Sequence, residues 1–265
     1  SGANGSVVAR VHADMLSVVT GKLARTSGIT AIRLFRWGLR EVTRRWADLE
    51  SRPEELTIKG GRTKLAEAIG AHRKGEVTDA LRLGQCLELV APGWTMGGLW
   101  TWFDGRQGSR HHGPGVLRWT WARELTPNSP DRCLKGRSGY LVPLPPNEPP
   151  LVGSRSQHGA QLALQHVFLR ELRVRARELR QEGSIHLDAD SWQPLMSMVG
   201  LRTPLNKLLD AWVAGNDNTE PFLVKLPGDR WTLASDHDEL LRFILGGEAK
   251  SEAGRRRQRR GRQVP

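Results

Sequence analysis

Residues 62–90 read RTKLAEAIGAHRKGEVTDALRLGQCLELV, a pattern that predicts two helices separated by a tight turn. Gly70 ends the short first helix, and the longer second helix runs over 74–90. The apolar positions that face a core on this second helix are Val77, Leu81, Leu83 and Leu87. Two helices joined by a glycine-containing turn in this way predict a helix-turn-helix.

The flanking sequence extends this motif. A helix over 28–49 places Ile32, Phe35, Leu39, Val42, Trp46 and Leu49 on one face. A short strand follows at Leu56-Thr57-Ile58, and after the two helices residues 94–103 and 116–122 predict a hairpin with a glycine-rich, basic loop. A helix, a strand, a helix-turn-helix and a hairpin in this order predict a winged helix with a charged wing.

The opposite face of the helix over 28–49 is basic. It holds Arg33, Arg36, Arg40, Arg44 and Arg45, and we expect these side chains to form a solvated helix surface. Before this helix, residues 6–24 predict another helical stretch, which is separated from it by a turn at Thr26-Ser27-Gly28.

The second half of the chain repeats the same order of elements. Residues 158–182 predict a long helix, and 184–187 a short strand. Asp188 caps a predicted helix that ends at Val199-Gly200, and a second one starts at Thr203-Pro204 and ends at Gly215. A hairpin over 222–233 closes the half. Because Ile69-Gly70 stands in the first half where Val199-Gly200 stands in the second, the sequence predicts a tandem repeat.

The predicted fold class is therefore mainly α with small β-hairpins, an α+β chain with two winged-helix domains. The length of 265 residues also favours two domains over one. The expected divisions are an N-terminal segment 1–27, a first domain 28–124, a Pro-rich linker 125–156, a second domain 157–247 and a basic tail 248–265. The linker has too many prolines for a helix or a central strand, which predicts a semi-rigid spacer.

Charge indicates the kind of partner. Forty Lys and Arg against 28 Asp and Glu give a net charge of +12 and a pI near 10.7, which favours a polyanion such as double-stranded DNA. No apolar run reaches the roughly 18 residues of a membrane span, and mean hydropathy is −0.46. Two distant cysteines predict no disulfide framework, so we expect a reducing, cytoplasmic location associated with the nucleoid.

Helix-turn-helix domains place the start of their second helix in the major groove, where Arg, Lys and Asn contact base edges. In the first domain the corresponding candidates are His72, Arg73, Lys74, Thr78 and Arg82. In the second domain they are Arg202, Thr203, Asn206 and Lys207. The wings add Arg106, Arg110, His111 and His112 in the first domain, with Lys225 and Arg230 in the second.

The C-terminal tail contains a run of arginines that we expect to bind phosphates without sequence preference. Its predicted DNA-binding residues are Arg255, Arg256, Arg257, Arg259 and Arg260. Ten tryptophans could instead stack on single-stranded bases, but most lie on apolar faces, which predicts core packing. Trp94, Trp100 and Trp102 are the candidates for exposed aromatic side chains.

The sequence does not favour an enzyme. It has no phosphate-binding loop of the Gly-x-x-x-x-Gly-Lys type and no His-x-x-Arg pair of a tyrosine recombinase. The adjacent His111 and His112 lack further metal ligands at a suitable spacing, and the aspartate pairs lie at helix starts, where they act as caps. We therefore expect no cofactor, no metal and no catalytic residues.

In its layout the chain resembles the tandem winged-helix replication initiators of plasmids and phages, on the two repeated turns, the two hairpins and the basic tail. The resemblance covers residues 28–245 and implies binding to direct repeats at an origin, origin opening, recruitment of a host helicase and a switch between monomer and dimer. A transcriptional repressor would contain the same helices. A further alternative is a protein-protein interaction or architectural module, in which the basic segments hold nucleic acid without specificity.

Overall fold

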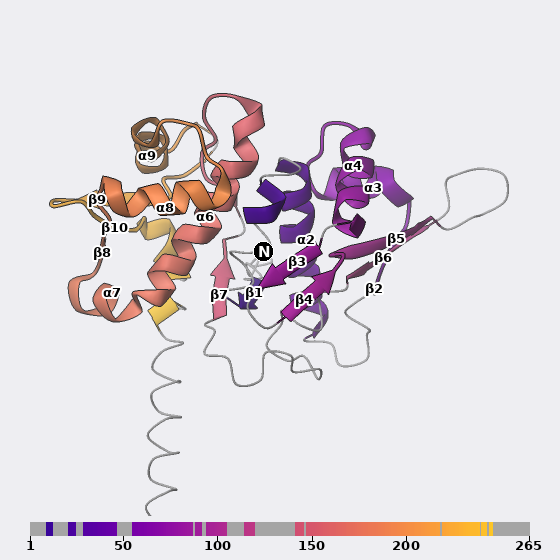
Figure 1. Ribbon diagram of the computed structural model, residues 1–265, viewed down its shortest axis with the longest axis horizontal. Helices are drawn as coiled ribbons and strands as arrows, with labels where there is room; N and C mark the ends of the chain where they lie inside the picture. Colours follow the sequence, from indigo (N-terminus) through magenta and orange to yellow (C-terminus); the bar gives the residue numbers. More distant parts are fainter. Residues whose placement is uncertain are drawn as a thin grey trace, which may run out of the picture.

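The computed structural model describes residues 9–12, 21–24, 29–46, 55–86, 88–91, 94–104, 114–119, 141–145, 147–217, 219–238, 240–242 and 244–245. Over these residues the chain folds into helices and small antiparallel sheets, an α+β arrangement (Figure 1). None of the described helices is long and apolar enough to cross a membrane. Two parts of the chain repeat one element order, the first unit (29–119) and the second unit (155–245).

The first unit consists of three helices and a three-stranded sheet. Its elements are α2 (Ile29–Trp46), β2 (Glu55–Ile58), α3 (Gly61–Ala68), α4 (Lys74–Cys86), β5 (Trp100–Asp104) and β6 (Gly115–Trp119). Strand β6 lies between β2 and β5 and is antiparallel to both, so Leu117 pairs with Leu56 on one side and Trp102 on the other. The predicted order of helix, strand, two helices and hairpin is confirmed.

The segment between α4 and β5 differs from the prediction. Helix α4 ends at Cys86 rather than Val90, and β3 (Glu88–Ala91) pairs with β4 (Trp94–Gly97) in a separate hairpin. The strand predicted over 94–103 is thus two strands. The chain bends between these two strands after Gly98, which has a φ of +72°, and the Leu99 N–H donates to the Gly84 carbonyl at 2.6 Å. Glycine is suited to this turn because a left-handed φ is costly for a residue with a Cβ.

The second unit repeats the sheet topology of the first. Its elements are α6 (Arg155–Val174), α7 (Ala176–Glu182), β8 (Ile185–His186), α8 (Ala189–Val199), α9 (Leu205–Ala214), β9 (Leu223–Leu226) and β10 (Arg230–Leu233), followed by η1 (Ser235–His237). As in the first unit, the last strand is central, and Trp231 of β10 pairs with Ile185 and Lys225. The helix predicted over 158–182 is divided at Arg175, where the backbone leaves helical geometry.

The repeat extends to the backbone of the turn between the paired helices. After α3, Gly70 has a φ of +64°, and the Ala71 N–H donates to the Ala66 carbonyl at 2.9 Å. After α8, Gly200 has a φ of +69°, and the Leu201 N–H donates to Met196 at 3.0 Å. Both bonds span five residues, which is the Schellman arrangement that ends a helix at a left-handed glycine. The predicted equivalence of the two turns is confirmed.

Tryptophans fill the interior of both units. Trp100, Trp119, Trp192 and Trp212 are each less than 2% exposed. Trp102 is 8% exposed, so the expectation that Trp100 and Trp102 lie on the surface is wrong. Their indole N–H groups are satisfied inside the fold, with Trp100 donating to the Leu81 carbonyl and Trp102 to the Asp104 carboxylate. The side chain of Trp94 is outside the described part.

Part of the Pro-rich connection belongs to the packed structure. Strand β7 (Leu141–Leu144) pairs antiparallel with β1 (Ala9–His12), so the prediction of helix over 6–24 is wrong at residues 9–12. A two-stranded sheet accepts Pro143 because each strand keeps one unpaired edge. Pro149 and Pro150 are buried, and the Pro150 carbonyl accepts from the indole of Trp212 at 3.1 Å. The end of the predicted spacer is therefore held against the second unit.

The two units pack together through α2 and α6 (Figure 1). Their buried apolar residues form one continuous cluster rather than two. The predicted solvated surface of α2 is wrong for its described arginines, because Arg36 is only 2% exposed, and Arg33 and Arg40 bind the connection. These three arginines therefore lie against the connection, and Arg36 also contacts Gln165 and His166 of α6. The side chains of Arg44 and Arg45 lie outside the described part.

Candidate nucleic-acid interface

Helix α4 has one buried and one exposed face. Val77 and Leu81 are buried in the first unit. Lys74, Thr78 and Arg82 follow one another at intervals of four residues and so share the other face. The predicted residues on this face and in the turn before it, which we call the α4 face, are His72, Arg73, Lys74, Thr78 and Arg82. All are exposed except Thr78, which is partly buried.

Thr78 is held by a residue that the sequence analysis did not select. Its hydroxyl accepts from Arg62 Nη1 at 3.2 Å and donates to the Lys74 carbonyl at 3.3 Å. Arg62 Nη2 also binds Asp104 Oδ2 at 2.6 Å, at the end of β5 where the wing begins. Arg62 thus joins α3, α4 and the base of the wing. Its sequence position, in the first turn of a short helix, gives no signal of this role.

Helix α4 also has two acidic side chains, Glu76 and Asp79. Glu76 is in the first turn and accepts from the Thr30 hydroxyl at 3.3 Å, which ties the starts of α4 and α2 together. A carboxylate is favourable there because the first turn of a helix has a partial positive charge. Asp79 is exposed, so the charge around the α4 face is positive but not uniform.

Helix α9 is the equivalent of α4 in the second unit. Leu208, Leu209 and Trp212 are buried, whereas Asn206 and Lys207 are exposed. Arg202, in the preceding turn, is also exposed, and its backbone N–H donates to Gln157 Oε1 at 2.6 Å. Three of the four predicted residues, Arg202, Asn206 and Lys207, therefore lie on one accessible surface, which we call the α9 face.

Thr203 is not on this surface. It is 7% exposed, and its hydroxyl accepts a hydrogen bond from Gln161 Nε2 at 3.2 Å. The same amide donates to the Val152 carbonyl, and Gln161 Oε1 accepts from the Val152 N–H. Thr203 is thus part of a buried network that holds the turn before α9 against α6.

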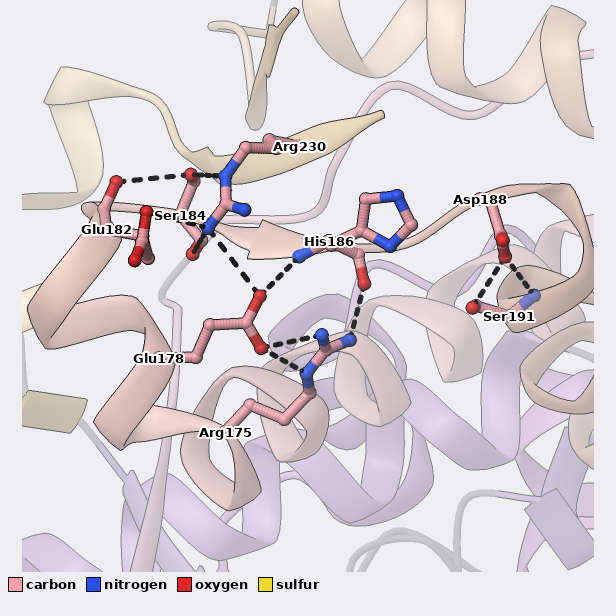
Figure 2. Close-up of polar contacts among 8 residues, drawn as sticks. All are labelled: Arg175, Glu178, Glu182, Ser184, His186, Asp188, Ser191 and Arg230. Atoms are coloured by element: carbon pink, nitrogen blue, oxygen red, sulfur yellow. Dashed lines mark hydrogen bonds and ion pairs between the residues drawn. The ribbon is translucent and has the colours of Figure 1, made fainter. Parts of the chain in front are cut away.

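The two predicted wing residues of the second unit have different surroundings. Lys225 on β9 is exposed, lies 3.7 Å from Asp229 Oδ1 and places its ammonium over the Trp231 ring. Arg230 begins β10 and pairs with His186 of β8, and Ser184 accepts from its guanidinium through both its hydroxyl and its carbonyl (Figure 2). The charge of Arg230 is therefore used within the second unit.

Figure 2 shows why Arg230 is held there. Glu178 and Glu182 of α7 lie 3.6 and 3.9 Å from its guanidinium. Glu178 also accepts from the His186 backbone N–H and pairs with Arg175, whose Nη1 donates to the His186 carbonyl. This cluster fastens α7 to β8 and β10.

Several predicted residues lie outside the described part of the chain. These are Arg106, Arg110, His111 and His112 of the first wing and Arg255, Arg256, Arg257, Arg259 and Arg260 of the tail.

Charge is distributed unequally between the two units. Residues 29–119 contain fifteen Lys and Arg against ten Asp and Glu. Residues 155–245 contain eleven against twelve. Despite their common topology, the first unit is therefore net positive and the second slightly negative.

A small groove adjoins the α9 face. Its volume is about 340 Å³, and it lies between α8, α9 and the β9–β10 hairpin. Trp192 and Leu209 line its floor, and Val213, 37% exposed, lies on α9 beside it. Within the described residues no three His, Cys, Asp or Glu side chains are placed to hold a metal ion.

Comparison of the chain with protein-family models, with curated proteins and with solved structures gave no match.

Proposed function

We propose that this chain is a sequence-specific double-stranded DNA-binding protein whose two units are winged helices. The observation that supports the proposal most directly is the repeated topology, a helix followed by a strand, two helices and a hairpin, with the last strand central in each sheet. In helix-turn-helix proteins the second helix of the pair enters the major groove. Here those helices are α4 and α9.

The α4 face has the chemistry that this role requires. Arg73, Lys74 and Arg82 are exposed donors that can contact guanine edges or phosphates, and His72 lies beside them. Arg62 binds Thr78 and Asp104, so the end of β5 from which the wing starts keeps a set position relative to α4. On the α9 face, Asn206 can pair with adenine, and Lys207 and Arg202 supply charge.

Two such units in one chain suit a target of two half-sites. This is consistent with a replication initiator of a plasmid or phage that binds repeated origin sites, the family that the layout resembles. Dimer formation and contact with host replication proteins would follow from that role. A transcriptional repressor is the closest alternative, because operators are also read by such helices.

The test is selection of duplexes from a random pool by the full chain, followed by titration of the selected and scrambled sequences at two salt concentrations. We expect the selected duplex to bind at least ~10³-fold more tightly than the scramble. Arg73→Ala with Lys74→Ala should reduce this ratio. Arg177→Ala with Arg242→Ala, two exposed arginines of the second unit, removes the same charge and should leave the ratio unchanged.

A second candidate function rests on the second unit alone. Its net negative charge and the apolar groove beside Val213 favour a unit that binds protein while the first unit holds DNA. The double variant Asn206→Ala with Lys207→Ala distinguishes the two candidate functions. Loss of selectivity at one half-site supports DNA reading by α9, whereas an unchanged selected sequence supports the interaction module.

A further inference from the structure

Arg36 lies where three segments of the chain meet. These segments are α2 of the first unit, the connection at Pro145 and Asn147, and α6 of the second unit. The residue is 2% exposed, and burial lowers the pKa of its guanidinium to about 9. A buried charge is retained only where hydrogen bonds replace its lost hydration.

Four partners replace that hydration. Arg36 Nη1 donates to Gln165 Oε1 at 2.8 Å and lies 3.1 Å from His166 Nε2. Its Nη2 donates to the carbonyls of Pro145 and Asn147, at 2.8 and 3.0 Å. Burial and the nearby Arg36 hold the pKa of His166 well below its usual value, so the imidazole is neutral and its Nε2 can accept. One side chain thereby joins α6 to the connection.

The neighbouring arginines of α2 bind the same part of the connection. Arg33 makes two bonds of 2.7 Å to the Glu148 carboxylate, one turn before Arg36. Arg40 Nη2 donates to the Pro145 carbonyl at 3.1 Å, one turn after it. Arg36 lies at the centre of this row and also reaches α6. The contact between the units therefore contains oriented hydrogen bonds in addition to apolar packing. These hydrogen bonds fix the angle at which α2 and α6 meet.

We propose that Arg36 is a positioning residue that sets which spacing between two DNA half-sites the chain accepts. This inference rests on the proposed function, since it assumes that the α4 and α9 faces each read one half-site. With this contact fixed, the two faces have one separation and one relative rotation. Each base pair inserted between half-sites moves one of them by about 3.4 Å along the axis and by roughly a tenth of a turn.

The experiment uses the full chain and the duplex that it selects from a random pool, in versions with one to five base pairs inserted between the half-sites. We expect the wild type to lose at least ~100-fold in affinity when five base pairs, about half a turn, are inserted. Arg36→Met removes the hydrogen bonds and keeps an unbranched side chain. It should bind the best spacing more weakly and lose no more than ~5-fold on the same insertion.

Two variants keep the test valid if Arg36→Met fails to fold. Gln165→Leu removes a single partner of Arg36 and should broaden the accepted spacing to a smaller extent. Gln165→Glu gives the guanidinium a carboxylate partner and should keep the wild-type spacing. Arg177→Met, at an exposed site on α7, is the control and should also keep it.

The outcomes are distinguishable. If the wild type selects no duplex, the proposed function fails and the inference fails with it. If it selects a duplex with a single half-site, sequence-specific binding stands and only the inference, which needs two half-sites, is overturned. If the wild type shows a strict spacing and the folded Arg36→Met and Gln165→Leu variants show the same one, only the inference is overturned. A purely structural role of Arg36 would lower affinity equally at every spacing.

Discussion

The indole of Trp119 lies directly against the backbone of Gly38, so a Cβ at residue 38 would overlap the ring. Two other contacts in the first unit are of the same kind, Trp100 against Gly84 and Trp102 against Gly115. Large tryptophans can approach the helices and the sheet this closely because the facing positions lack side chains. The first unit therefore depends on paired glycine and tryptophan positions for its packing.

Gly38→Ala should strongly destabilise the protein. The added methyl must displace a fully buried indole, and overpacking of this kind costs about 1–3 kcal/mol or more. Gly75→Ala is the matched control, since a Cβ there meets no atom within 4 Å and alanine favours a helix. Thermal unfolding should show a lower Tm for the first variant and an equal or higher Tm for the second. Equal values for both would contradict the packing described.

Acidification should destabilise the fold through His166. Burial, with a smaller contribution from Arg36, lowers the pKa of this histidine in the folded state, so the unfolded chain binds a proton more readily. Its contribution to stability is full above the ordinary histidine pKa and is lost as the pH falls below about 6.5, at up to about 1.4 kcal/mol per pH unit.

Urea titrations between pH 7.5 and 5 measure this dependence. His166→Gln should show a shallower loss of stability over the range, whereas His72→Gln, at an exposed site, should follow the wild type. A wild-type slope in the His166→Gln variant would show that this histidine does not limit stability at low pH.

The N-cap of α8 should stabilise the fold at neutral pH and lose this contribution in strong acid. Asp188 Oδ1 accepts from the hydroxyl and the backbone N–H of Ser191, at 2.6 and 2.8 Å, and these bonds lower the pKa of the carboxyl. The contribution is present above the ordinary aspartate pKa and is lost as the pH falls through the lowered value. Asp188→Ala should lower the Tm at pH 7, and the difference from the wild type should shrink below about pH 3.5.

Removal of residues 254–265 should weaken binding to every duplex. The deleted segment contains six arginines. Each phosphate contact contributes about 0.9 to the slope of log K against log salt, so the slope should flatten by up to about five. A tail of the same composition in shuffled order should restore both quantities. If truncation changed the preferred sequence instead, the tail would be a specific reader.

The element order could be predicted from sequence because each turn has a strong local signal. Gly70, Gly200 and the Pro227-Gly228-Asp229 turn end or reverse the chain in the expected places. The segment over 87–97 could not be predicted in the same way. Leu-Glu-Leu-Val at 87–90 fits either the last turn of a helix or a short strand, and the β3–β4 pairing that decides it is tertiary.

The contact between the two units also could not be predicted from the sequence. Arg33, Arg36 and Arg40 are spaced like a solvated helix face. Nothing local indicates that the Pro145 carbonyl and the Glu148 carboxylate will bind them. On the α4 and α9 faces, exposure of Lys74, Asn206 and Lys207 follows from the helical period, and Arg73 is exposed in the turn before α4. The inward position of Thr203 depends on Gln161, 42 residues away.

Strand β1 cannot pair with β7 until the ribosome has made the residues between them. His12 leaves the ribosome long before its partner Leu141, and at 5–20 residues per second the interval is on the order of ten seconds. Throughout that time the edge of β1 has no β7 to pair with and is open to other strands. Shortened chains that end before residue 141 would keep this exposed edge, and we expect such fragments to aggregate during synthesis even where their own helices form.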